Sequence, residues 1–161
     1  MRIYIPATAR DLVAATLSPR LVHAVTPVLA RELDGESQEY LESVAFDAAT
    51  DDSLELIAAA LPEDAGLPVR RVVIAADVDD AAVAAADDEL VTAVELREAV
   101  GWDRVVSIHV DHELSEPVLR TAIAHPDSAE AADAAGEAKL LWFDVSERVD
   151  LAVELGVAAR A

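Results

Sequence analysis

The sequence predicts an α/β fold, with α+β as the close second choice: one domain with a mixed sheet of about five or six strands and helices packed on it. Three observations support this prediction. Apolar segments of strand length alternate with segments whose apolar residues recur at helical spacing. Residues 71–76, RVVIAA, are apolar on both alternating faces, which is typical of a central strand covered on both sides. The 161 residues suit one domain and contain no internal repeat or dividing linker.

The N-terminal half is predicted to hold three strands separated by helices. Thr26-Pro27 combines a hydroxyl N-cap with a proline at the first helical position, which is a strong helix start. The apolar residues of 41–48 and 54–61 do not share one stripe at 100° per residue, so we expect a bend or break near residues 50–53. In order, the expected elements are a strand at 2–6, a helix from 8 to about 17, a strand at 21–25, a helix from 27 to about 34, helical segments around 41–48 and 54–61 that follow Ser37, and a strand at 71–76.

The C-terminal half is predicted to begin with an acidic loop and to continue with three more strands. Residues 77–89 are rich in alanine and aspartate, and we interpret them as a loop with at most one helical turn. Gly156 is placed to end a terminal helical turn. The expected elements are strands at 92–96, 105–110 and 139–145, a helix from 115 to about 124 that ends before Pro126, a short helix at 128–135, and a helical turn at 150–155.

The charge is strongly acidic, with 32 Asp and Glu against 12 Lys and Arg and a net charge of −20. Nucleic acid and anionic membranes are therefore not expected as partners, because both are bound largely through basic residues. Cations and basic proteins are favoured. The chain has no cysteine, which excludes disulfides and thiolate chemistry, and it has no signal peptide or apolar run long enough for a membrane span. We expect a cytoplasmic protein.

Five short motifs occur together in this order: MRIYIPAT at 1–8, HAVTP at 23–27, RRVVIAAD at 70–77, HVD at 109–111 and LLWF at 140–143. Through them the chain resembles an uncharacterised actinobacterial family of small cytoplasmic proteins, catalogued only as a domain of unknown function. The resemblance covers nearly the whole chain and implies no known activity, cofactor or catalytic residue. It also implies an acid at the position of His112, so that this histidine would not be essential.

The usual catalytic and nucleotide-binding signatures are missing. The five glycines lie far apart, so there is no G-x-G-x-x-G and no P-loop, and no G-x-S-x-G nucleophile elbow occurs. No cofactor is predicted. The segments 77–80 and 87–89 are rich in carboxylates but do not fit a calcium loop, and a solvated acidic loop explains them better.

The stretch VVSIHVDHELSEP at 105–117 places four potential metal ligands within five residues. On a strand, His109 and Asp111 point to one face, as the ligands of many metal sites do. The stretch also resembles part of the H-x-H-x-D-H pattern of metallo-β-lactamases, but Ser107 stands where the first histidine is needed. A strand that leads into a helix capped by Ser115 explains the same residues, and we favour that interpretation.

Polar residues follow several of the predicted strands, and they form a further candidate site. If these strands are parallel, their carboxyl ends meet in one crevice, as in open α/β sheets. Such a crevice would suit a metal or a cationic ligand, although the two threonines also fit as helix caps. The residues concerned are Thr8, Thr26, Asp77, Asp111 and Asp144.

Two functions are consistent with the sequence. The leading hypothesis is a non-catalytic or accessory acidic domain that acts through protein–protein contact, with a partner or as a homodimer, and it rests on the missing signatures, the acidity and the apolar run at 140–143. The alternative is a metal-dependent hydrolase or small-ligand enzyme. In that alternative Asp77, His109 and Asp111 bind a divalent metal, and His23 or His112 acts as the base.

Overall fold

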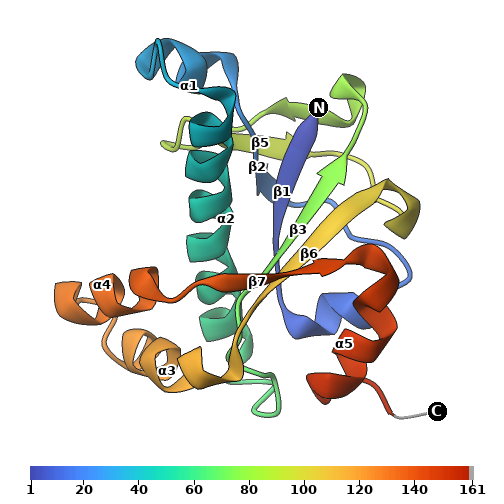
Figure 1. Cartoon of the computed structure of the whole chain (residues 1–161), viewed down its shortest axis with the longest axis vertical. Helices are drawn as coiled ribbons and strands as arrows, with labels where there is room; N and C mark the ends of the chain where they lie inside the picture. The colour runs from blue at the N-terminus through green and yellow to red at the C-terminus, as the bar shows by residue number, and fades with distance from the viewer. Residues whose placement is uncertain (160–161) are drawn as a thin grey trace.

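The computed structural model describes residues 1–159, and its centre is one sheet of seven strands (Figure 1). The strand order is β4-β5-β2-β1-β3-β6-β7, and every neighbouring pair is antiparallel. The predicted mixed sheet of five or six strands is therefore wrong, and the architecture is α+β-like, the second choice. The strands are β1 (Arg2–Ala7), β2 (Leu21–His23), β3 (Val72–Asp77), β4 (Val83–Ala85), β5 (Ala93–Leu96), β6 (Val105–Asp111) and β7 (Leu140–Asp144).

Alternation along the strands gives the sheet two different faces. One of them, which we call the aliphatic face, carries side chains such as Ile3, Ile5, Ile74 and Ile108, each with no solvent exposure. Leu151 and neighbouring apolar residues of the C-terminal helix α5 (Arg148–Glu154) pack against it, together with the 3-10 helix η1 (Ala9–Val13). This face forms the main hydrophobic core, in which small and branched aliphatics are fully buried and Trp102 and Phe143 pack at its margin, partly buried.

The opposite face is covered by the long helix α2 (Gln38–Ala60), and we call it the α2 face (Figure 1). The predicted bend near residues 50–53 is wrong, since α2 is continuous. The buried residues of α2 include a stripe at spacing four, and Ser53 is one of its members. The Ser53 hydroxyl donates to the Ala7 carbonyl (2.6 Å) and accepts from the Val72 N–H (2.9 Å). Ser53 is therefore a polar member of the buried stripe of α2, and its hydroxyl is hydrogen-bonded to the backbone of the sheet.

Two helices lie close to the C-terminal end of α2. Buried residues of the two helices after β6 form a cluster with Ile57, Leu67 and Val69, close to the C-terminal end of α2 (Figure 1). The expected helix at 8–17 is only the 3-10 turn η1, and the expected loop at 77–89 contains a 3-10 turn and the edge strand β4. The remaining helices are α1 (Pro27–Glu32), α3 (Glu116–Ala124), α4 (Ala129–Glu137), and the 3-10 turns η2 (Asp80–Ala82), η3 (Trp102–Arg104), η4 (Glu113–Ser115) and η5 (Val145–Glu147).

No helix in residues 1–159 is both long enough and apolar enough to span a bilayer. The longest, α2, carries acidic residues along its length.

Candidate functional site

His109 lies half-buried on the predicted strand β6, and its side chain is on the α2 face. Its Nε2 is 2.9 Å from the Ser107 hydroxyl, and its ring meets Phe46 of α2 edge-on with 4.9 Å between centroids. Desolvation lowers the pKa of His109 to about 4, so the imidazole is neutral at pH 7. The residue is thus an aromatic and polar surface group at neutral pH.

Asp111 is completely buried, and both of its carboxylate oxygens are used by Arg71. The guanidinium donates from Nε (2.8 Å) and Nη2 (2.9 Å), and the Arg71 backbone N–H donates as well (2.8 Å). His112 lies at the surface, where its Nδ1 accepts from the Leu114 N–H (3.0 Å) and caps η4. Ser115 is the N-cap residue of α3, as predicted, but its side chain makes no capping hydrogen bond.

Asp77 pairs with Arg2 on the neighbouring strand, with 2.6 Å between Oδ1 and Nε. It shares the α2 face with His109, but His109 lies opposite Val73, four residues from Asp77 along β3. That spacing corresponds to about 13 Å. The predicted ligands are thus not brought together, and within residues 1–159 there is no group of three or more His, Asp or Glu that could hold a metal.

The predicted crevice of polar strand ends does not form. Neighbouring strands are antiparallel, so their carboxyl ends point in opposite directions along the sheet. The residues act locally instead. Thr26 caps α1 by accepting from the Leu29 N–H (3.1 Å), and Asp144 accepts from the Ser146 N–H (2.8 Å) at the start of η5. The Thr8 N–H donates to the carboxylate of Asp11 (3.0 Å) in the first turn of η1.

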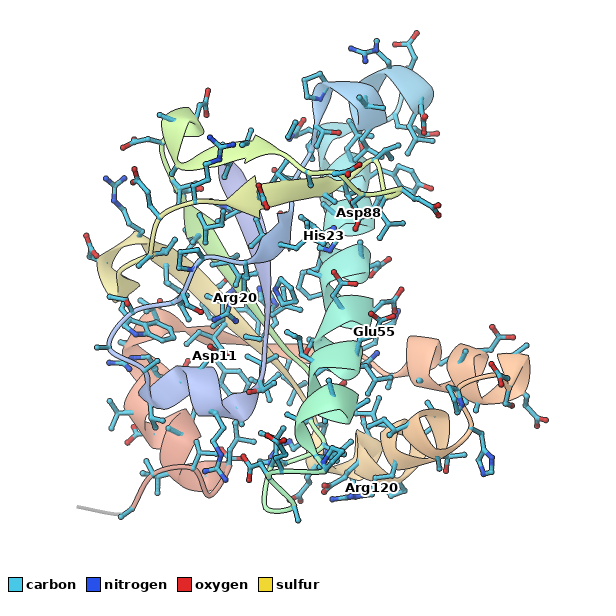
Figure 2. The ribbon with its side chains drawn as sticks, turned by 180° about the vertical axis from the view of Figure 1, so that it is seen from behind. Asp11, Arg20, His23, Glu55, Asp88 and Arg120 are labelled. Carbon is cyan, nitrogen blue, oxygen red and sulfur yellow. The ribbon has the colours of Figure 1, made fainter. Side chains whose placement is uncertain are left out.

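His23 is fully buried between β2 and α2, where it bridges two polar side chains. Its Nδ1 is 2.8 Å from the Thr92 hydroxyl and its Nε2 is 2.6 Å from the Asp52 carboxylate. Asp52 is partly exposed and lines a cavity of about 520 Å³ with Arg20, Glu55 and other residues. Figure 2 shows His23 directed toward α2, with Glu55 further along that helix.

A groove lies on the α2 face where α2 leaves β6 and β7 uncovered, with a volume of about 490 Å³. We call it the aromatic groove, because four rings line it, from Tyr4, Phe46, His109 and Trp142. Tyr4 and Phe46 meet edge-on at 5.9 Å, and Trp142 lies directly opposite His109 in the β6–β7 register. Trp142 is 61% exposed and so presents a large apolar ring to solvent within the groove.

The rim of the aromatic groove is acidic. Glu39 and Glu42, from the first turns of α2, line it together with Arg2. Arg2 is already paired with Asp77, and no basic side chain of the described chain lies within ion-pair distance of either glutamate. Desolvation, followed by the nearby Glu42, raises the pKa of Tyr4, so its hydroxyl stays neutral. The groove therefore combines aromatic surface with an excess of negative charge, since Arg2 is paired with Asp77 and two glutamates remain.

Sequence reasoning missed most of the partners of the residues it selected. It did not find Arg71, Asp52 or Phe46. For Arg71 a signal existed: the residue is in phase with Val73 and Ala75, which face α2, and a basic residue on a buried face requires an acidic partner. No comparable signal marks Asp52 or Phe46, since their positions depend on the path of a helix over the sheet.

Comparison with known proteins gives one match. A model described as a family of unknown function, DUF6912, matches residues 1–152. No curated protein and no solved structure matches the chain.

Proposed function

We propose that this chain, which belongs to the family of unknown function DUF6912, is a non-catalytic binding module that takes a basic, extended segment of a partner protein into the aromatic groove. The observation that carries the proposal is the exposed Trp142 in the same groove as Glu39 and Glu42, which form no ion pair within residues 1–159.

The chemistry of the groove favours a cationic side chain. A guanidinium or ammonium group is attracted to the face of an aromatic ring, most strongly to tryptophan. Glu39 and Glu42 add Coulomb attraction, and the net charge of −20 raises the rate of encounter with basic partners. Exposed tryptophans beside other aromatics are also the residues that most often dominate protein interfaces.

The edge of the sheet supplies the second part of the binding site. β7 is the last strand in the sheet order, so its outer backbone groups have no strand partner within residues 1–159. An extended segment can add to such an edge, with backbone bonds for affinity and alternate side chains for specificity. Leu140 and Trp142 point to the α2 face of β7. Every second side chain of an added strand would then lie beside the aromatic groove.

The alternative, a metal-dependent hydrolase, has less support from the geometry. Asp111 and Asp77 would each have to release an arginine before they could bind a metal. His109 would have to turn away from Ser107. The groove needs no such rearrangement to accept a ligand.

The test is a titration of the protein with a short peptide of alternating valine and arginine. Binding is measured by tryptophan fluorescence or by calorimetry. We expect Trp142→Ala to weaken binding about tenfold or more, a loss typical of an interface anchor. Replacing Glu39 and Glu42 with glutamine should weaken binding to a smaller degree and should reduce its dependence on salt.

Matched controls separate the groove from general surface effects. Leu114 is 80% exposed and lies outside the groove, so Leu114→Ala should leave peptide affinity unchanged. A peptide of alternating valine and glutamate should not bind. Equal binding of the two peptides, or an unchanged affinity of Trp142→Ala, would contradict the proposal.

A further inference from the structure

A second feature of the α2 face concerns the unused part of the buried Arg71 guanidinium. Only 2% of the Arg71 side chain is exposed. Its Nε and Nη2 donate to Asp111, and Nη2 also donates to the Ala138 carbonyl (3.2 Å). Nη1 has no protein acceptor, yet no fully buried side-chain nitrogen or oxygen in residues 1–159 lacks a partner. Nη1 is therefore in contact with solvent.

Arg71 lines a cavity of about 280 Å³ between α2, α3 and α4, which we call the helix cavity, and it also lines a neighbouring cavity with Ala138 and Lys139. Its walls are apolar and short. They are made largely by Leu54, Ala58, Ala122, Ile123 and Ala135. A flat ring fits between small side chains of this kind, and apolar walls with a few polar groups at one end are typical of small-molecule sites.

Asp51 of α2 lines the helix cavity together with Arg71. Desolvation raises the pKa of Asp51, and Arg71 opposes this rise more than any other neighbouring charge, which indicates that the two groups are close. Arg71 Nη1 and the Asp51 carboxylate are thus a donor and an acceptor in the lining of the cavity, which also contains the polar side chains of Glu55 and His125. Asp111, Asp51 and Glu55 together outnumber the single arginine, so an anionic ligand is disfavoured.

We propose that the helix cavity binds a small neutral heterocycle with a lactam edge, meaning a ring carbonyl beside a ring N–H. The carbonyl oxygen accepts from Arg71 Nη1 and the ring N–H donates to Asp51. The apolar part of the ring lies against the alanines of α2, α3 and α4. This complementarity needs both groups at once, because a carbonyl alone leaves Asp51 without a donor and an amine alone leaves Nη1 without an acceptor.

The test is an NMR titration of the ¹⁵N-labelled protein with 2-pyridone, with pyridine as the matched probe that lacks the carbonyl and N–H pair. We expect 2-pyridone to shift the Arg71 Nε–H signal and the amides around Ala122 and Ala135. We expect pyridine to bind at least tenfold more weakly. Because replacement of Arg71 would expose the buried Asp111 charge, the variants are made at Asp51.

Asp51→Ala should weaken 2-pyridone binding at least tenfold. Asp47→Ala removes the same charge one turn earlier on α2, outside the helix cavity, and should change affinity less than twofold. Ala132→Leu should fill the mouth of the cavity and abolish the shifts. The proposal is overturned if pyridine binds as well as 2-pyridone, if the two aspartate variants behave alike, or if no cavity signal shifts at the solubility limit of the probe.

Discussion

The two faces of the sheet are held by different kinds of interaction. The aliphatic face is closed by non-directional packing of residues such as Ile3, Ile74 and Ile108. The α2 face has a small apolar cluster around Ala45 and Ala49, and it is bridged to α2 and within the sheet by polar contacts. These contacts are His23–Asp52, Ser53 with the backbone of β1 and β3, Arg71–Asp111 and Arg2–Asp77.

This difference shows how one sheet can separate stability from binding. Hydrophobic packing tolerates small shifts, whereas a hydrogen bond fixes direction as well as distance. Two of these contacts, from Asp52 and Ser53, fix the position of α2 over the sheet, and the two arginine–aspartate pairs join neighbouring strands. The aromatic groove and the helix cavity, both on the α2 face, are bounded by that helix.

The largest expected effect comes from breaking the buried pair on the α2 face. Asp111→Ala leaves the Arg71 guanidinium buried without a counter-charge, and we expect a loss of about 3–5 kcal/mol in the free energy of unfolding. The double variant Arg71→Met with Asp111→Leu should lose less than Asp111→Ala, since it buries no charge. Urea denaturation measures both. If the double variant is the less stable of the two, the pair contributes net stability and the contrast between the faces is smaller than we infer.

A smaller effect is expected from the hydroxyl that joins α2 to the sheet. Ser53→Ala leaves the Val72 N–H and the Ala7 carbonyl without their partner in a buried position, at a cost of about 1–3 kcal/mol. Ile108→Val on the aliphatic face also removes a single heavy atom and should cost about 0.5–1.5 kcal/mol. Equal losses in the two variants by thermal and urea unfolding would remove the distinction between directional and non-directional contacts.

The smallest expected effect is a pH dependence of the free energy of unfolding that comes from His109 on the α2 face. The pKa of folded His109 is about 4, below the ordinary value of 6.5, so the unfolded chain takes up the proton first as the pH falls. Stability is therefore complete above pH 6.5 and is lost as the pH falls from 6.5 to about 4. Because His109 is only half-buried, solvent screening limits the loss to roughly 1 kcal/mol.

The measurement for His109 is a difference between two proteins, since many carboxylates titrate in the same range. Urea unfolding of the wild type and of His109→Gln at pH 7.5 and pH 4.5 should show a larger drop for the wild type. Ile108→Val, next to it on the aliphatic face, should follow the wild-type pH profile. The same drop in His109→Gln would show that His109 is not the group concerned.

Much of the local structure was predictable from the sequence, because it depends on neighbouring residues. The alternation in residues 2–6 and the apolar run at 71–76 predicted β1 and β3, and Thr26-Pro27 predicted the start of α1. The continuity of α2 was missed because the prediction compared Val44 with Leu54, which are only partly buried, whereas the buried stripe continues through the polar Ser53. The strand order was also missed, since β1 pairs with residues about 70 positions away and no local pattern encodes that pairing.

The candidate site was predictable only in part for the same reason. His109, His23 and the apolar run at 140–143 could be selected by residue type, and the aromatic groove does contain His109 and Trp142. The groove also depends on Phe46, and the buried pair depends on Arg71, 40 residues before Asp111. These contacts arise from the path of α2 and from the register of β3 against β6.

The strand order has a consequence for how the chain matures during its synthesis. The central strands β2, β1 and β3 all lie within the first 77 residues, together with α2, and later strands add on both sides. The sheet can thus assemble from its middle outward as the polypeptide leaves the ribosome, since nascent segments fold roughly in order of their emergence. β7 is the last strand to join the sheet, so β6 remains an unpaired edge strand for the longest time. A chaperone that protects nascent chains would therefore find an exposed apolar strand at β6.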